Sequence, residues 1–270
     1  PTNISVLNLA FYPTERGQYN FNTTELDANG RLIDPQRRWG GIMRNLSTTD
    51  FEASNIEYIE FWLMDPFVYD TLSSGGDFYI NLGNISEDIL RDGRKSFENG
   101  LPTSSEELSK TDQTAWGRVP TKQYLPVGFD NDQAKRPYQD IGLDGLSSSV
   151  DLDGAGILDE QFFFSEYINQ LRNKITNSDV LAGFESDPAG DNFRHYLSGV
   201  YDQQRATILD RYKYFNGTEN NSPVATGTTS QQSYSTPDVE ELGTDNTMNE
   251  NEAYYQYRIS LRPQDMEVGK

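Results

Sequence analysis

Apolar positions near both ends of the chain follow patterns that are typical of β-strands. Such patterns occupy residues 4–12, 17–21, 56–64, 77–82 and 254–261. In residues 56–64, apolar side chains fall on both faces, which predicts a central strand covered on two sides. Residues 77–82 follow the turn at Gly75-Gly76 and are expected to form the partner strand of residues 56–64. Short strands with a turn about every ten residues favour an all-β sandwich over a parallel α/β fold.

The middle of the chain has a different pattern. Residues 91–160 are polar and interrupted by prolines, which predicts a long functional excursion rather than regular structure. Apolar residues at helical spacing then predict one helix over residues 160–175 and a second over 191–214, with Asp191 as its N-cap. Residues 216–236 are low in complexity and are expected to form an exposed loop or linker.

These patterns predict a mainly β fold, a jelly-roll-like β-sandwich with one long insertion. The sandwich is expected to combine residues 1–90 with residues 253–270, because the late strand has no neighbouring strand in the sequence to pair with. Residues 91–236, with about two helices, form the insertion, and residues 237–252 form an acidic loop. Residues 253–262 should therefore pair with strands from the N-terminal part.

Composition narrows the range of functions. The chain has 270 residues, 42 acidic and 22 basic, and a formal net charge of −20, which argues against binding nucleic acid phosphates or an anionic lipid surface. The sequence contains no cysteine, which excludes thiolate metal sites, disulfides and cysteine catalysis. It also lacks a secretory signal pattern and any apolar run of the length that a membrane helix needs, about 20 residues. We expect the chain to be a piece of a larger protein that does not itself insert into the membrane.

The acidic loop before the last strand resembles the spacing of a twelve-residue calcium loop. The expected ligands are Glu241, Asp245, Thr247 through its carbonyl group, Asn249 and Glu252. Asn246 stands where the sharp turn of such a loop falls, and Glu252 is placed to close the site with both carboxylate oxygens. A solvated acidic turn is the alternative, because Gly243 occupies a ligand position.

A second stretch, DIGLDGLSSSVD, has the same spacing. Its expected ligands are Asp140, Asp144, Leu146 through its carbonyl group, and Asp151, with Gly145 at the sharp turn. Asp-Gly is also an ordinary turn dipeptide, so a simple turn is the competing interpretation. We therefore predict structural Ca²⁺ at residues 241–252 and weaker binding at residues 140–151.

Residues with catalytic chemistry are scarce, so no enzymatic activity is expected. His195 is the only histidine, and the phosphate-binding glycine loop that nucleotide enzymes use is absent. Trp39 and Trp116 could stack on sugars, whereas Trp62 lies within a predicted strand and is expected in the core. A carbohydrate-binding jelly-roll module is therefore the alternative function, and a glycoside hydrolase that uses two carboxylates is a more distant one.

Long stretches of the sequence resemble one protein family. They are FYPTERGQYNFN (11–22), LIDPQRRWGGIMR (32–44), FEASNIEYIEFWLMDPF (51–67), FYINLGNISEDIL (78–90) and DNTMNENEAYYQYRISLRP (245–263), supported by PYQDIGLDG and RYKYFNGTEN in the middle. Together these stretches are similar to the SprA/Sov family, giant outer-membrane proteins of the Bacteroidetes type IX secretion system that are also linked to gliding motility. The family pattern has better calcium ligands at the places of Glu241 and Gly243.

This resemblance implies a domain-sized piece of a translocon through which folded cargo crosses the outer membrane. The expected function is a non-enzymatic domain that contributes to protein export and gliding motility by contacting other secretion-system proteins, exported cargo or the rest of its own chain. The expected location is at the outer membrane, on either its periplasmic or its cell-surface side.

Overall fold

The structure is a computed structural model in which the chain forms two compact units. One unit combines Pro1–Gly41 with Asp88–Glu240, and the other combines Ile42–Glu87 with Glu241–Lys270. We name them the helical unit and the ribbon unit. The structure describes residues 6–48, 50–70, 72–96, 104–121, 142–151, 154, 156–193, 196–213, 240–243, 246–248 and 251–265. The predicted low-complexity segment 216–236 lies outside these residues.

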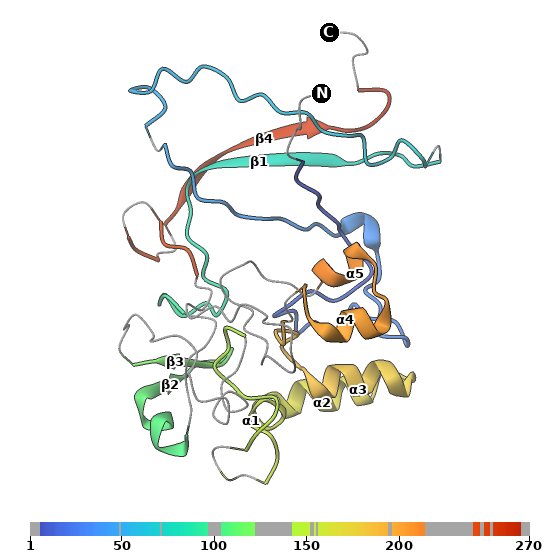
Figure 1. Cartoon of the computed structure of the whole chain (residues 1–270), viewed down its shortest axis with the longest axis vertical. Helices are drawn as coiled ribbons and strands as arrows, with labels where there is room; N and C mark the ends of the chain where they lie inside the picture. The colour runs from blue at the N-terminus through green and yellow to red at the C-terminus, as the bar shows by residue number, and fades with distance from the viewer. Residues whose placement is uncertain are drawn as a thin grey trace. The chain divides into compact units, whose positions relative to one another are not determined.

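Helices of the described chain all belong to the helical unit, as do two short strands (Figure 1). The helices are α1 (Asp159–Phe163), α2 (Ser165–Arg172), α3 (Ser178–Ser186), α4 (Gly199–Gln204) and α5 (Ile208–Lys213), with 3-10 turns at Pro35–Arg37 and Ser105–Lys110. Strands β2 (Thr111–Gln113) and β3 (Arg118–Pro120) pair antiparallel. Among the described residues, no helix is long and apolar enough to cross a membrane.

The ribbon unit contains one antiparallel pair of strands, β1 (Asp77–Asn84) and β4 (Ala253–Ser260). Asp77 pairs with Ser260 and Asn84 with Ala253, so the two strands match along their full length (Figure 1). Gly83 lies against the backbone of Tyr254, where a Cβ atom would be 2.5 Å from the tyrosine Cα. The expected pairing of the late strand with an N-terminal strand is therefore confirmed for β1.

The prediction of a β-sandwich is wrong. The described residues form two separate two-stranded sheets and five α-helices, and no second layer of strands covers β1 and β4. Residues 6–12, 17–21 and 56–64 carry the expected apolar residues but do not form strands. Alternating apolar side chains show that a face needs to be covered, whereas a strand also needs a neighbour for its backbone hydrogen bonds. In the described chain these segments lack that neighbour.

Helix predictions were correct in one region and wrong in another. The segment predicted as one helix over 160–175 is divided into α1 and α2, with a break at Phe164. The second predicted helix, over 191–214, is replaced by a loop followed by α4 and α5, which are separated by a left-handed residue, Arg205, with φ 51°. Helix α3 was not predicted, and its N-cap is Asn177, whose side chain accepts hydrogen bonds from the N–H groups of residues 179 and 180.

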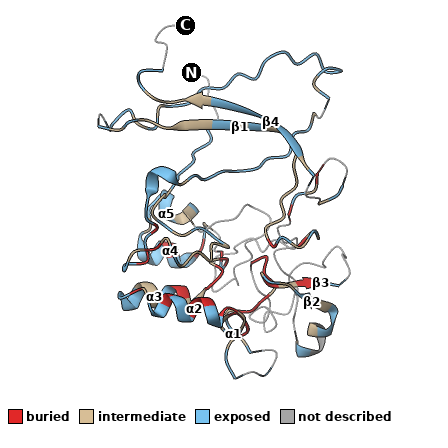
Figure 2. Ribbon diagram, turned by 180° about the vertical axis from the view of Figure 1, so that it is seen from behind, coloured by how far each residue is buried: buried red, intermediate tan, exposed pale blue. Residues whose placement is uncertain are grey.

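The apolar core lies in the helical unit, around the inner faces of α2 and α3 (Figure 2). Its buried members are Leu26, Leu32, Leu146, Phe164, Tyr167, Leu171, Ile175, Phe184 and Ala189. Phe21 packs on Phe164 with ring centroids 4.6 Å apart and meets Tyr167 edge-on at 5.2 Å. In contrast, β1 and β4 contain no buried residue. The helical unit thus supplies its own core, and the backbone N–H groups of two core residues, Leu146 and Ala189, donate hydrogen bonds to the polar cluster described next.

Candidate functional site

Three carboxylates meet in the interior of the helical unit, those of Asp144, Glu160 and Asp191. Each offers one oxygen atom, and these oxygens lie within 4.8 Å of one another. All three residues have an exposed fraction of 0%. Burial of a carboxylate is unfavourable unless hydrogen bonds, protons or a cation compensate the charge. This buried carboxylate cluster is therefore a candidate functional site.

Glu160 enters the cluster from the first turn of α1. Its Oε1 atom accepts a hydrogen bond from the N–H of Ala189 at 2.7 Å, and its Oε2 atom accepts one from the hydroxyl of Ser148. Burial raises the pKa of Glu160 well above its ordinary value, and the negative charges of Asp191 and Asp187 raise it further. The hydrogen bonds from Ser148 and Ala189 act in the opposite direction.

Asp191 lies in the loop after α3, and contacts with other residues fix one oxygen of its carboxylate. Its Oδ2 atom accepts a hydrogen bond from the Tyr19 hydroxyl at 3.1 Å, and a Cβ atom on Gly142 would lie 1.8 Å from the same oxygen. Its Oδ1 atom is buried, and no donor reaches it from the described part of the chain. Burial raises the pKa of Asp191 to about 7, and the charge of Asp187 contributes in the same direction.

Asp144 reaches the cluster from one of the two loops that were predicted to bind calcium. Its Oδ1 atom accepts a hydrogen bond from the N–H of Leu146 at 2.9 Å, which closes a tight turn around Gly145. Gly145 has φ +66°, and a Cβ atom there would lie 2.4 Å from the carbonyl oxygen of Arg118. The sharp turn expected at Gly145 is therefore present, and it places Asp144 beside Glu160 and Asp191.

The remaining predicted ligands of that loop lie elsewhere. Asp151 is exposed, and its carboxylate accepts hydrogen bonds from the N–H groups of Gly154 at 2.8 Å and Gly156 at 2.7 Å. The side chain of Leu146 belongs to the apolar core. Asp140 lies outside the described residues. Among the predicted ligands of this loop that the structure describes, only Asp144 belongs to the carboxylate cluster.

Predicted ligands of the other loop, residues 241–252, belong to the ribbon unit. Glu252 accepts hydrogen bonds at Oε1 from the N–H of Ser86 at 2.8 Å and from its hydroxyl. The Thr247 carbonyl accepts from the N–H of Gly243 at 3.2 Å, and the Glu241 carbonyl accepts from the N–H of residue 87 at 2.8 Å. A turn is present at Asn246, with φ 59°. Asp245 and Asn249 lie outside the described residues, so calcium binding here stays a prediction.

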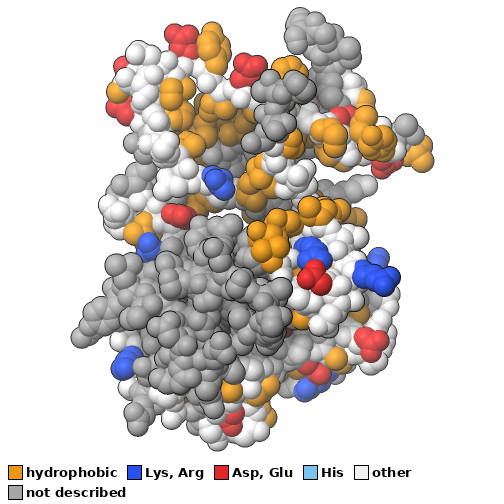
Figure 3. All heavy atoms as spheres, viewed as in Figure 1, with side chains coloured by type: hydrophobic (Ala, Val, Ile, Leu, Met, Phe, Trp, Pro, Cys, Tyr) orange, Lys and Arg blue, Asp and Glu red, His pale blue; other side chains and the backbone are white. Residues whose placement is uncertain are grey.

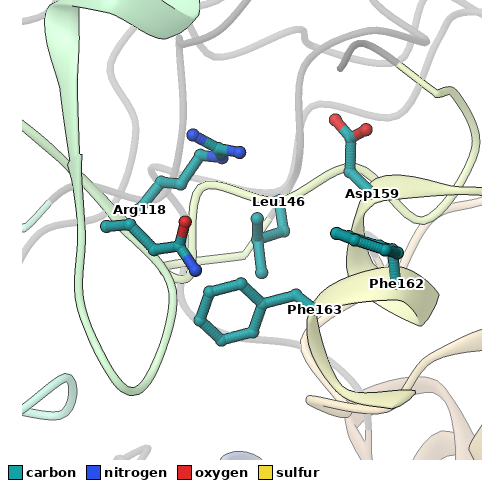
Figure 4. Close-up of a pocket in the computed structure, with 6 residues that line it drawn as sticks. Arg118, Leu146, Asp159, Phe162 and Phe163 are labelled. Atoms are coloured by element: carbon teal, nitrogen blue, oxygen red, sulfur yellow. The ribbon is translucent and has the colours of Figure 1, made fainter. Parts of the chain in front are cut away.

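A small pocket of about 140 Å³ opens in the helical unit, lined by Gln113, Arg118, Leu146, Asp159, Phe162 and Phe163 (Figure 4). The two phenylalanines come from α1 and form one wall, while Arg118 comes from β3. The volume is below the 300–1,000 Å³ that is usual for small-molecule sites, by roughly a factor of two. The pocket therefore gives little support to a substrate site.

A second buried carboxylate, Glu240, joins parts of the helical unit that are distant in sequence. Its Oε1 atom accepts hydrogen bonds from the N–H groups of Ile89 at 2.6 Å and Leu90 at 3.3 Å, and its Oε2 atom accepts one from Ser96 at 2.8 Å. Burial raises the pKa of Glu240 to about 7, against the effect of these three hydrogen bonds. Because its oxygens are occupied by backbone donors, Glu240 has a structural role.

Tryptophans that were considered for sugar stacking have different environments. Trp116 packs on Phe21, with ring centroids 5.3 Å apart, and lies under the guanidinium group of Arg91 at 4.9 Å. Trp39 is 85% exposed. Trp62, which was expected in the core, is 95% exposed, so that expectation is wrong. His195 lies outside the described residues.

Exposed apolar side chains are concentrated in the ribbon unit. None of the buried apolar side chains of the described chain belongs to this unit. Its exposed large residues include Tyr58, Trp62, Met64, Tyr69, Leu72 and Tyr255, each at least 76% exposed. Hydrophobic side chains are visible on the surface around the extended segments of this unit (Figure 3). We name this set of side chains, together with the rest of 56–64 and the tyrosines of β4, the exposed apolar surface.

Sequence reasoning did not identify Glu160 or Asp191 as members of a site. Acidic residues are so numerous, 42 in 270, that no pair of them stands out in the sequence. Both positions were included in predicted helices, and Asp191 was interpreted as an N-cap. The signal that was available is weak: Glu160 lies on the same helical pattern as the apolar residues of α1 and α2, where an ionised side chain is unusual.

A comparison with known families matches residues 166–270 to the model SprA_N, described as "Motility related/secretion protein". The matched range begins within α2, and it includes Asp191 of the carboxylate cluster and strand β4 of the ribbon unit. No curated protein matches the chain.

Proposed function

We propose that the chain, which matches the SprA_N model of motility-related and secretion proteins over residues 166–270, is a non-catalytic binding domain of an outer-membrane secretion translocon. In this role it supports protein export and gliding motility by contacting another protein of the same machinery. The family match supports the link to secretion and motility. The exposed apolar surface of the ribbon unit is the observation that supports a contacting role.

Segment 56–64 carries the densest part of this surface. Each of its large apolar side chains is exposed, from 39% for Ile56 to 95% for Trp62. Among the described residues, the aromatic ring contact of this segment joins Phe61 to Phe78 of β1, with ring centroids 5.6 Å apart. Soluble proteins rarely leave contiguous apolar patches of this kind in water, and such patches commonly mark sites of protein interaction. The sequence of the segment is suited to a strand, so it can form one when a neighbour supplies the backbone partners.

The strand pair adds a second part of the surface. Tyr254, Tyr255 and Tyr257 of β4 are 51–76% exposed, and Tyr79 of β1 is 44% exposed. Among the described residues β1 and β4 pair only with each other, which leaves one edge of each strand available for an added strand. Aromatic side chains next to a free strand edge are a common basis for recognition by β-augmentation.

Charge favours a particular kind of partner. The ribbon unit contains fourteen acidic and four basic residues over its full sequence. A matching surface therefore has an apolar centre, an available strand edge and a basic rim, since complementary charge steers association and excludes other partners. We assign this surface to a resident protein of the secretion machinery. Exported cargo is the other outcome that the experiment below distinguishes.

The test uses the full-length natural protein in its own cells. A photo-activated cross-linking residue is placed at Trp62 or at Tyr255, and at Asp179 of α3, an exposed position of the helical unit, as the control. We expect both ribbon positions to capture one common membrane-associated protein, with little capture from Asp179. Capture of many secreted proteins instead would reassign the surface to cargo, and equal, unspecific capture at all three positions would contradict a specific interface.

Function is tested by removing the apolar side chains. The double substitution Trp62→Ser and Tyr255→Ser is expected to lower secretion of a reporter cargo and gliding speed, while the amount of protein in the outer membrane is unchanged. The control is Asp179→Ser, which changes an exposed residue of the helical unit. Unchanged secretion and gliding in the double variant would contradict the proposed function.

A further inference from the structure

The geometry points to a divalent cation site, which we assign to Ca²⁺, formed by the carboxylates of Asp144, Glu160 and Asp191. This site differs from both loops considered from the sequence, because it takes one residue from one of them and two from elsewhere in the helical unit. It also does not depend on the proposed function of the ribbon unit. The proposed cation joins the 142–151 segment, α1 and the loop after α3.

Distances agree with the size of the ion. Ca²⁺ binds carboxylate oxygens at about 2.3–2.6 Å, so two oxygens on one ion are separated by no more than about 4.6–5.2 Å. The three carboxylate oxygens lie within 4.8 Å of one another. Mg²⁺ binds oxygens at shorter distances, about 2.0–2.1 Å, and requires nearly ideal octahedral geometry, whereas Ca²⁺ accepts varied geometries. A hard cation with oxygen ligands is therefore the appropriate class, and we choose Ca²⁺ because ligands from three separate segments suit its more flexible coordination.

One oxygen of the cluster is available for a ligand. Asp191 has no exposed surface, its Oδ2 atom is held by Tyr19, and its Oδ1 atom has no donor among the described residues. A buried carboxylate oxygen without a donor is energetically unfavourable, and a bound cation would compensate it. The hydroxyl of Ser148, which already contacts Glu160, can supply a further neutral oxygen.

The surrounding charges do not neutralise the cluster. Asp187, whose negative charge acts on Glu160 and Asp191, uses its Oδ1 atom to accept from the N–H groups of Gly190 at 2.9 Å and Asp191 at 3.1 Å. The guanidinium group of Arg16 donates to the carbonyl oxygens of Asp187 and Pro188 and lies 4.3 Å from the ring centre of Phe184. Arg16 donates its hydrogen bonds to the backbone of the loop, and its charge acts against the burial that raises the pKa of Asp187, whereas the charges that act on the pKa of Glu160 are negative ones.

Protons compete with the cation for the same oxygens. Carboxylates bind a metal ion in their deprotonated form, so the affinity of the cluster for Ca²⁺ should be greater at high pH than at low pH. Binding of Ca²⁺ at pH 8 and its loss near pH 5 is therefore the expected dependence.

The experiment measures thermal unfolding of the 270-residue chain at pH 8 with Ca²⁺ or with EDTA, together with Tb³⁺ luminescence excited through tyrosine. Tyr19 touches Asp191 and lies close enough to sensitise a lanthanide at the site. A hundredfold excess of Ca²⁺ over its dissociation constant should raise the midpoint by roughly 5–10 °C. Mg²⁺ at the same concentration should have a smaller effect.

Three variants locate the site. Glu160→Gln removes a charge while keeping the shape, so it should abolish the Ca²⁺-dependent shift and the Tb³⁺ signal. In EDTA its midpoint should equal or exceed that of the natural chain, which shows that the variant folds. Asp151→Asn and Glu252→Gln, at the two loops predicted from the sequence, should retain the shift. The assignment would be overturned if the natural chain had equal unfolding midpoints in Ca²⁺ and in EDTA. It would also be overturned if Glu252→Gln removed the Ca²⁺-dependent shift and Glu160→Gln retained it.

Discussion

The helical unit and the ribbon unit differ in how far their apolar side chains are buried. The helical unit buries Leu171 and its neighbours around α2 and α3, and it encloses even carboxylates. The ribbon unit buries no apolar side chain among its described residues and leaves Trp62 and Tyr255 in water. The difference is what the proposed function expects if a partner covers the apolar side chains of the ribbon unit, whereas the helical unit has its own core. Stability and function should therefore respond to substitutions in different units.

The largest effect is expected from a substitution in the core of the helical unit. Leu171 has no exposed surface, so Leu171→Ala should lower the free energy of unfolding by about 2–5 kcal/mol through lost burial and a residual cavity. Denaturation by urea, followed by circular dichroism, measures this change. The matched substitution in the ribbon unit is Trp62→Ala, for which a change within about 0.5 kcal/mol is expected because the side chain is already exposed. Similar losses in both variants would remove the contrast between the units.

A second, smaller effect concerns pH and Glu240. Its pKa in the folded chain is raised to about 7, from an ordinary value of 4.5. The folded chain then binds more protons than the unfolded chain between these values, so this residue's contribution to stability is fully present below pH 4.5 and is lost as the pH rises through 7. Glu240→Gln should reduce the fall in unfolding midpoint between pH 4.5 and pH 7.5, measured in EDTA.

The buried carboxylate cluster adds to the same pH dependence, because the pKa of Asp191 is also raised, to about 7. Asp191 therefore loses its contribution in the same direction as Glu240 when no cation is bound. In the Glu240→Gln variant, the fall in unfolding midpoint that is due to Asp191 should remain. Added Ca²⁺ should reduce this fall. A midpoint that rises between pH 4.5 and pH 7.5 in EDTA for the natural chain would contradict this account of both sites.

The smallest effect is expected at the strand pair. Asp77 accepts hydrogen bonds from Arg258 at 3.0 Å and from Nη2 of Arg262 at 2.9 Å, which holds the pKa of Asp77 below its ordinary value. These groups are near solvent, so Asp77→Asn should lower the unfolding midpoint less than Leu171→Ala does. Amide exchange in residues 253–260 should become faster, with no change in α2. The contribution of Asp77 to stability is lost as the pH falls through its lowered pKa. This pH dependence is opposite in sign to that of Glu240.

Sequence patterns predicted local features better than the assembly of the fold. Apolar alternation predicted β4, and the lack of a neighbouring strand in the sequence predicted its pairing with an N-terminal strand. Residue types predicted the turns at Gly145 and Asn246. The β-sandwich was wrong because the pattern in residues 56–64 reports a surface to be covered and does not specify what covers it. A strand pattern therefore has two physical outcomes, an internal sheet or an exposed segment that awaits a partner.

The candidate site was less accessible from the sequence than the fold. Asp144 was predicted as a ligand, but its companions Glu160 and Asp191 lie 16 and 47 residues further along the chain. The three carboxylates come together through the packing of α1 and of the loop after α3. The spacing of the residues in the sequence does not indicate this packing. A twelve-residue loop template requires ligands that are close in sequence, so it could not find a cluster built from three separate segments.

Amide hydrogen exchange tests the central claim, that a partner completes the ribbon unit. Exchange is measured by mass spectrometry on the isolated 270-residue chain and on the full-length protein in outer membranes. We predict strong additional protection of residues 56–64 and 253–260 in the membrane sample, while residues 165–172 of α2 are equally protected in both. Equal exchange of residues 56–64 and 253–260 in the two samples would contradict the claim, because a partner that covers these segments must slow their exchange.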